Sequence, residues 1–283
     1  MLNTWKQEFS KKFLSIIKVS SRFDTFRDWA HLVAITCHQA PVNLGILPKD
    51  DTYERLENSY LEKVKAFDSS TLNVFAELFG IVQLAFSEAK TDFLGQLYQE
   101  LEIGFQKDNG QFFTPYSVAK MTAEATITAD FLQPKIEKNG FITVGEPAVG
   151  AGALLIAAAE VIEELGYDPR KHMYFEGVDV DRLCFDMAYI QMSVMGIPGR
   201  IIHGNSLSQE IWEVRKTPPL QLIEKHEEID PSYKISQLLL QLESEELNDN
   251  SHTLETKETE NREKRKKNNR TPEGRQLNLF EDL

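Results

Sequence analysis

Two glycines, Gly150 and Gly152, lie in the stretch of this sequence with the clearest chemical meaning. They follow a short apolar run at residues 141–144 that suits a buried strand, and from Ala153 to Glu164 the pattern becomes helical. Glycine at such a turn lets a ligand approach the backbone, and the first turn of the following helix offers unpaired N–H groups. We therefore expect a binding site for a nucleotide-like ligand at this turn.

Polar side chains follow the next two predicted strands. These strands, at residues 173–180 and 200–202, end near Asp179 and Asn205. A carboxylate in this position can accept hydrogen bonds from both hydroxyl groups of a ribose. Because the carboxyl ends of parallel strands meet at one edge of a sheet, we expect both residues to lie beside Gly150.

The elements that must position these residues divide into three parts. Helical spacing of apolar residues predicts a helical region over residues 1–105, with helices at 25–38, 53–67, 72–86 and 92–101. Residues 106–247 alternate strand and helix, which predicts an α/β domain with a Rossmann-like parallel sheet that is truncated after residue 220. Residues 248–283 are polar and charged and are expected to be disordered.

The segment before the predicted helix at 116–131 allows two interpretations. In the first, Phe112 and Phe113 form a hydrophobic latch beneath that helix, and Thr114 is its N-cap. In the second, the segment packs over a ligand held at the glycine turn. Periodicity alone does not choose between the two.

Composition limits the classes of function. The formal net charge is −13, whereas a protein that binds nucleic acid unaided usually carries a basic surface. If DNA is the substrate, the contact must be local or a partner must supply it. Cys37 and Cys184 are far apart and have no metal-ligand neighbours, so we expect reduced thiols and no metal site. No run approaches the roughly 18 apolar residues of a membrane span, and we expect a cytoplasmic protein with no membrane association.

A dinucleotide-binding fold requires a third glycine three positions after the second, and Leu155 stands there instead. The combination of GQFFTP, EPAVGAG and GVDVD instead resembles the N6-adenine DNA methylases of the type I modification-subunit kind, over roughly residues 90–210. The stretch from Met187 to Leu207 is similar to small stand-alone methylase-like proteins of bacterial mobile elements.

The resemblance implies S-adenosylmethionine as cofactor, DNA as substrate and a restriction-modification role. It implies that Gln111, Phe112, Phe113, Thr114 and Pro115 line the cofactor, that Glu146, Pro147, Ala148, Gly150 and Gly152 form its main turn, that Asp179 holds the ribose and that Asn205 faces the adenine ring. The sequence departs from the family pattern at Val149, where cysteine is common, and at Asn205, where aspartate is usual.

A larger departure concerns catalysis. The family uses an Asn/Asp-Pro-Pro-aromatic element after its fourth strand to hold the flipped adenine, and this sequence has none. Residues 217–220 keep the two prolines and residues 230–233 keep an acid and a ring. The catalytic residues therefore stay unassigned. Three hypotheses remain, namely an adenine methylase, a catalytically silent subunit or anti-restriction decoy, and a helical interaction protein that binds no cofactor.

The chain ends with an apolar peptide in a charged context. Gln276, Leu277, Leu279 and Phe280, within residues 276–280, resemble the peptide by which bacterial replication and repair proteins bind the DNA polymerase sliding clamp. A disordered tail gains nothing from exposed leucine and phenylalanine unless they bind a partner. The resemblance implies that the leucine and phenylalanine side chains fill an apolar pocket and that Gln276 forms a hydrogen bond at its rim. Alternatively, the run folds back on the chain or has no role.

Overall fold

A computed structural model describes residues 2–17, 21–101, 103 and 113–229. By compactness the chain divides into two units, Met1–His226 and Glu227–Leu283, and nearly all of the second lies outside the described residues. The predicted disordered tail and the peptide at 276–280 fall in that part of the chain, so they stay predictions.

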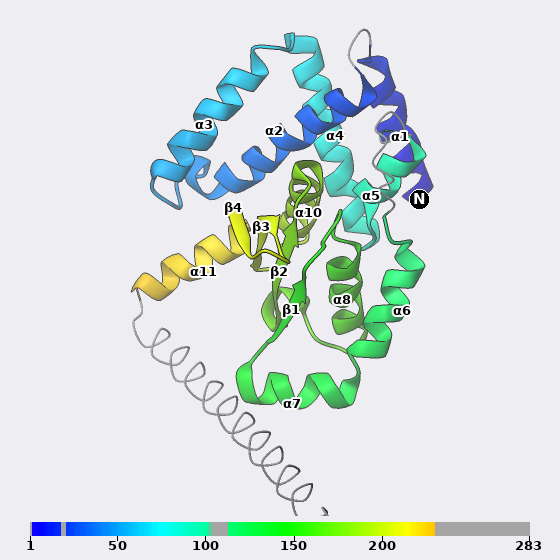
Figure 1. Cartoon of the computed structure of the whole chain (residues 1–283), viewed down its shortest axis with the longest axis vertical. Coiled ribbons are helices and arrows are strands. Elements are labelled where there is room, and N and C mark those ends of the chain that lie inside the picture. The colour runs from blue at the N-terminus through cyan, green and yellow to red at the C-terminus, as the bar shows by residue number, and fades with distance from the viewer. Residues whose placement is uncertain (1, 18–20, 102, 104–112, 230–283) are drawn as a thin grey trace, which may run out of the picture. The chain divides into compact units, whose positions relative to one another are not determined.

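Five helices form the first part of the chain (Figure 1). They are α1 (Leu2–Ser15), α2 (Arg22–Asn43), α3 (Asp51–Val64), α4 (Ser69–Glu88) and α5 (Phe93–Glu100). Side chains of Ser21, Asp50, Asp68 and Asp92 cap the last four of these helices. The predicted aromatic core is present, because Phe9, Trp29 and Phe93 are buried and the Phe9 ring contacts the other two.

The end predicted for the helix at 25–38 is wrong, since α2 continues past Pro41 to Asn43. The proline lies in the last turn of the helix, so the backbone hydrogen bond that it cannot donate is lost only at the helix end, and its carbonyl oxygen accepts hydrogen bonds from the N–H groups of Ile46 and Leu47. α4 is long and apolar enough to cross a membrane by length and composition. A single helix of this kind is weak evidence of a span, because a core helix of a soluble protein meets the same criterion.

The helix expected at 116–131 is two helices, α6 (Tyr116–Thr126) and α7 (Ala129–Asn139). Thr128 interrupts it, because its backbone is extended and its side chain accepts a hydrogen bond from the Phe131 N–H at the start of α7. α6 packs against α8 (Ala153–Glu164). α7 leads through Gly140 into the first strand.

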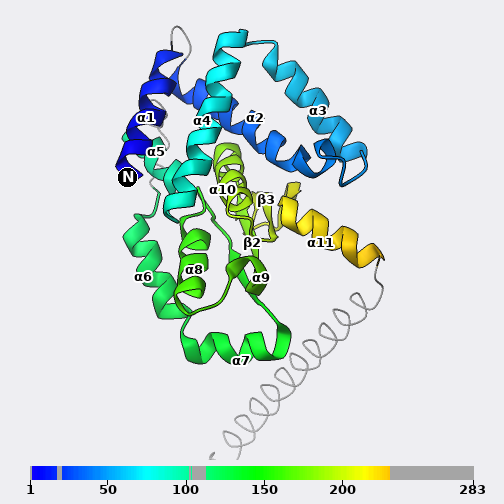
Figure 2. The same ribbon diagram turned by 180° about the vertical axis from the view of Figure 1, so that it is seen from behind.

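The sheet contains β1 (Ile142–Glu146), β2 (Met173–Asp179), β3 (Gly199–Asn205) and β4 (Glu210–Lys216), in that spatial order. β1, β2 and β3 are parallel, as predicted, whereas β4 runs antiparallel to β3 and was not predicted. The remaining helices are α9 (Pro169–His172), α10 (Arg182–Val194) and α11 (Pro218–Ile229), and Figure 2 shows α8 to α10 from behind. The α/β fold class with a helical first region is confirmed.

α10 joins the helical region to the sheet, because it contacts α2 as well as β2 and β3. The fully buried Asp186 of α10 pairs with Arg215 of β4, Nη1 to Oδ1 at 3.0 Å, and with His31 of α2, Nδ1 to Oδ2 at 3.2 Å. Burial alone would raise the pKa of Asp186, but His31, Arg215 and Arg182 hold it below its ordinary value. The helices and the sheet therefore share one core, into which an ion-pair cluster is built.

Candidate functional site

The turn after β1 has the conformation that its glycines predict. Gly150 and Gly152 have φ angles of 54° and 103°, a left-handed region that side chains disfavour. The Val149 N–H donates to the carbonyl oxygen of Val178 in β2 at 2.9 Å, and the Ala148 N–H donates to Glu146 Oε1 at 3.0 Å. The turn is thereby fixed to the carboxyl ends of two neighbouring strands.

The turn leads directly into α8. Gly152 is the N-cap residue, and no side chain caps the helix. The first turn of α8 contains no acidic residue, so the partial positive charge at this end is not offset from within the helix. This end of α8 is suited to a hydrogen-bond acceptor or an anionic group.

Asp179 at the end of β2 is bound to the same turn. Its Oδ2 accepts a hydrogen bond from the Gly150 N–H at 2.8 Å, and its Oδ1 accepts one from the Asp181 N–H at 2.8 Å. Burial raises the pKa of Asp179, and these two N–H donors act in the opposite direction. Because a carboxylate has about four acceptor sites, the side chain keeps acceptor capacity for a ligand.

Phe113 reaches the turn from the segment before α6. A Cβ atom added at Gly150 would lie 3.3 Å from the Phe113 ring, and that ring packs edge-on against Tyr98 with centroids 5.2 Å apart. Thr114 is exposed, and the prediction that it caps α6 is wrong, because Pro115 occupies the N-cap position. Pro115 is exposed too. Gln111 and Phe112 lie outside the described residues.

Asn205 lies at the carboxyl end of β3, one strand away from Asp179. Its Oδ1 accepts hydrogen bonds from the N–H groups of Leu207 at 2.9 Å and Ser208 at 3.2 Å. The carbonyl of this side chain therefore stabilises its own loop, and its NH₂ group is the part left for a ligand. The structure brings Phe113, Gly150, Gly152 and Asp179 together, with Asn205 at the same edge of the sheet.

Comparison with known proteins decides the family. A model of the N-6 DNA Methylase family matches residues 89–266, more than half of the chain. This protein belongs to the N-6 DNA methylase family. No curated protein matches the sequence.

Solved structures that match this chain include a proposed class I S-adenosylmethionine-dependent methyltransferase from Listeria monocytogenes, at 18% identity and a TM-score of 0.38, over 75% of this chain and 56% of that one. Another is the type I restriction-modification system methyltransferase subunit from Streptococcus thermophilus, at 14% identity and a TM-score of 0.35, over 75% of this chain and 59% of that one. A third is the modification subunit of a proposed type I restriction enzyme from Vibrio vulnificus, at 18% identity and a TM-score of 0.31, over 55% of this chain and 28% of that one. This chain spans less than two thirds of the length of each.

Among residues 113–229, no counterpart of the Asn/Asp-Pro-Pro-aromatic element lies at the carboxyl edge of the sheet, where β1, β2 and β3 end; this edge, the proposed site of the cofactor, is called the cofactor edge below. The Thr217 N–H donates to the carbonyl oxygen of Gly199 at 2.9 Å, and the Gly199 N–H donates to Thr217 Oγ1 at 3.1 Å. Because β4 is antiparallel, Thr217, Pro218 and Pro219 lie at the amino end of β3, opposite Asp179 and Asn205. The tetrapeptide at 217–220 therefore does not face the turn, and residues 230–233 lie outside the described residues.

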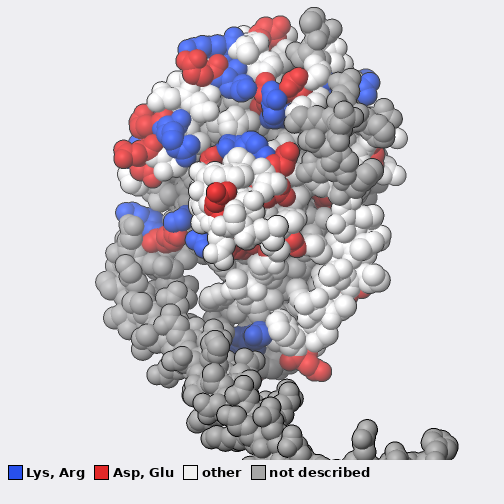
Figure 3. Space-filling view, viewed as in Figure 1, with Lys and Arg blue, Asp and Glu red and all other residues white. Residues whose placement is uncertain are grey.

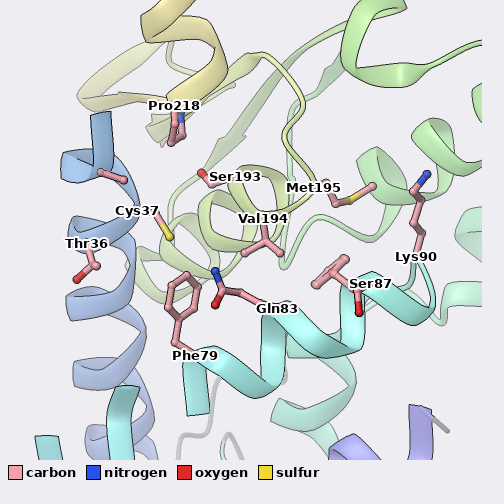
Figure 4. A pocket seen from close by; sticks show the side chains of 12 residues that line it. Thr36, Cys37, Phe79, Gln83, Ser87, Lys90, Ser193, Val194, Met195 and Pro218 are labelled. Carbon is pink, nitrogen blue, oxygen red and sulfur yellow. The ribbon is translucent and has the colours of Figure 1, made fainter. Parts of the chain in front are cut away.

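A groove of about 460 Å³ lies elsewhere, between α2, α4 and the C-terminal end of α10 (Figure 4). Cys37, Phe79, Gln83 and Met195 are among its lining residues. Burial raises the pKa of the Cys37 thiol to about 12, so this cysteine is not a reactive thiolate. No residue of the predicted cofactor set lines the groove, and the described residues contain no cluster suited to a metal ion.

Proposed function

We propose that this N-6 DNA methylase-family protein binds S-adenosylmethionine at the glycine turn and belongs to a DNA modification system as an adenine N6-methyltransferase-like protein. The observation that supports this most is the hydrogen bond from the Gly150 N–H to Asp179, which joins the strand-end acid to the turn. A ribose held by Asp179 would place the rest of the cofactor along the turn and the free end of α8. Family membership supplies the class of reaction.

The turn and the segment before α6 offer residues for both sides of the proposed cofactor. A Cβ at Gly150 would lie 3.3 Å from the Phe113 ring, closer than an ordinary contact, so glycine lets the segment before α6 pack onto the turn. Phe113, Thr114 and Pro115, with Gln111 and Phe112 before them, would line one side of the cofactor, and Glu146, Pro147 and Ala148 the other. Asn205 would present its NH₂ group to the adenine. When bound, the cofactor supplies the methyl group.

DNA is the proposed substrate, with a partner subunit supplying most of the contact. The net charge of −13 opposes unaided binding to phosphate, which is why we assign the phosphate contacts to a partner. We propose that the protein acts in the cytoplasm. The Leu279 and Phe280 side chains would anchor the chain to the sliding clamp through an apolar pocket, with Leu277 beside them and Gln276 at the rim.

A second function, that of a catalytically silent subunit or anti-restriction decoy, is favoured by one observation. The Pro-Pro sequence lies at the end of the sheet opposite the cofactor edge, so it cannot hold an adenine beside Asp179. A silent subunit would bind cofactor without transferring its methyl group. The two functions therefore differ in methyl transfer and agree in cofactor binding.

Calorimetry with S-adenosylmethionine tests the cofactor site. We expect binding by the wild-type chain and, for Asp179→Ala, affinity weaker by at least about tenfold, since a site built to pair with a hydroxyl loses much when the pair is broken. Asp168→Ala is the matched control. Asp168 caps α9, which directly precedes β2, so it lies before the amino end of the strand that ends at Asp179, and it contacts Arg170 instead of the turn. Absence of heat at millimolar cofactor would refute the proposed function.

Two further experiments separate the alternatives. Transfer of labelled methyl groups to unmethylated DNA, with and without candidate partner subunits, distinguishes the active from the silent protein. Activity in any combination excludes the silent one, and binding without transfer in all combinations excludes the active one. For the tail, a Leu279→Ala, Phe280→Ala double variant should lose retention on immobilised clamp, and unchanged retention would refute that assignment.

A further inference from the structure

The hairpin of β3 and β4 contains an irregularity at the cofactor edge of the sheet. His203 is paired with Glu213 and Gly204 with Ile211, so Trp212 is an extra residue in a β-bulge. A bulge re-aims side chains and is common beside functional sites. Here it brings the Trp212 ring against the His203 ring, with centroids 4.9 Å apart and planes at 75°.

Two backbone features are specific to this hairpin. A Cβ atom at Gly204 would collide with the carbonyl oxygen of Glu210, so only glycine allows the strands to approach there. Gln209 has a φ of 60°, and among the described residues no other non-glycine residue has a positive φ. Such conformations cost free energy and tend to be retained where function depends on them.

Contacts through His203 connect Trp212 to the segment that contains Asp179. The His203 ring also packs against Phe185 of α10, at 5.6 Å between centroids, and His203 Nε2 donates to the Val180 carbonyl oxygen at 3.2 Å. Val180 directly follows Asp179. Asp179 and His203 are also partners in the β2–β3 register. His203 is thus held by the Phe185 ring and the Val180 carbonyl oxygen, and its own ring packs against Trp212.

The surface at this position is aromatic and apolar. Trp212 is 53% exposed, and its hairpin neighbours Ile211 and Leu207 are exposed as well. In Figure 3 the middle of the view is white apart from one acidic group, with basic and acidic side chains around it. An exposed indole carries a flat apolar face that a base can stack on.

We propose that Trp212, supported by His203, forms a stacking surface for an adenine ring at the cofactor edge. The inference rests on the proposed function, because it assigns the base that accompanies the ribose at Asp179. The adenine belongs either to S-adenosylmethionine or to DNA, since both present the same ring. A protein partner at this surface is the outcome that would overturn the proposal.

Tryptophan fluorescence and calorimetry on the full chain test the proposal. The difference between wild-type and Trp212→Phe emission isolates Trp212, because the other two tryptophans are unchanged. S-adenosylmethionine should quench this difference signal. Trp212→Ala should weaken binding by roughly 5- to 150-fold, the range expected for one stacked base, whereas Trp212→Phe should bind within a few fold of wild type.

Leu44→Ala is the control, because Leu44 is 74% exposed and lies at the C-terminal end of α2 instead of on this hairpin. Circular dichroism checks that each variant is folded. If the wild type and Trp212→Ala bind S-adenosylmethionine equally and neither responds to a single-stranded deoxyadenosine oligonucleotide, the stacking surface is refuted while the proposed cofactor site stands.

The oligonucleotide arm identifies the source of the ring. Quenching by S-adenosylmethionine alone assigns the cofactor's adenine to Trp212. Quenching by the oligonucleotide in the presence of saturating S-adenosylhomocysteine, and its loss in Trp212→Ala, assigns a DNA base. If the wild type binds no S-adenosylmethionine, the proposed function is refuted. The response of Trp212 fluorescence to the oligonucleotide then tests the stacking surface independently of the cofactor.

Discussion

Acid should destabilise this fold through one buried histidine, His38 of α2. Its Nδ1 lies 3.3 Å from the Tyr189 hydroxyl of α10 and accepts a hydrogen bond from Gln221 Nε2 of α11 at 3.1 Å. Burial, followed by the positive charge of Arg215, lowers the pKa of His38 from 6.5 to about 4. The folded protein therefore holds this ring neutral at a pH where the unfolded chain protonates it.

Proton binding at His38 is coupled to unfolding, because the unfolded chain takes up a proton there at a higher pH than the folded chain does. A base whose pKa is lower in the folded state stabilises the fold above its unfolded pKa, and that contribution is lost as the pH falls from 6.5 towards 4. With these two values, the free energy of unfolding should fall by about 2 kcal/mol between pH 7.5 and pH 5 on account of His38 alone. This is a large share of the stability of an ordinary domain.

Urea unfolding followed by circular dichroism at pH 7.5, 6 and 5 measures this contribution. His38→Gln removes the titrating group and keeps a polar side chain, and its stability at pH 7.5 gives the cost of altered packing, which is subtracted at each pH. The wild type should lose about 2 kcal/mol more than the variant on going to pH 5. Parallel pH profiles for the two proteins would refute the assignment of the acid sensitivity to His38.

Two other variants test the ion-pair cluster and the turn. Arg215→Met should reduce the free energy of unfolding, measured with urea, by about 3 kcal/mol, because it removes a charged partner from the buried Asp186. Adding Asp186→Asn to the same chain should recover part of this loss. A change below about 0.5 kcal/mol for Arg215→Met would contradict the ion-pair argument. Gly152→Val should abolish S-adenosylmethionine binding in calorimetry, because the φ of 103° disfavours a β-branched residue and the site backs onto Ala188. Gly166→Ala is its matched control, since Gly166 also has a positive φ of 90° but lies at the other end of α8 with open space around it; equal binding by the two variants would contradict this prediction.

The sequence predicted the parts of the site that depend on residues close together in the chain. Gly150 and Gly152 indicated a left-handed turn before a helix, and the apolar runs before Asp179 and Asn205 indicated parallel strands that end at one edge. Each of these signals is local, since a φ preference or a strand propensity acts within a few residues. The failures at Pro41 and Thr128 were local too, and they concern helix ends, where one hydrogen bond shifts a boundary.

Only the tertiary structure decided how distant segments meet. The direction of β4 places Thr217 at the wrong end of the sheet for catalysis, the segment after α5 brings Phe113 onto Gly150, and the bulge turns Trp212 onto His203. A strand pattern carries no information on its partner, its direction or a one-residue register shift, because these are set by pairing and packing between segments far apart in the chain. The sequence thus determined the glycine turn and the strand ends beside it, and the fold determined what surrounds them.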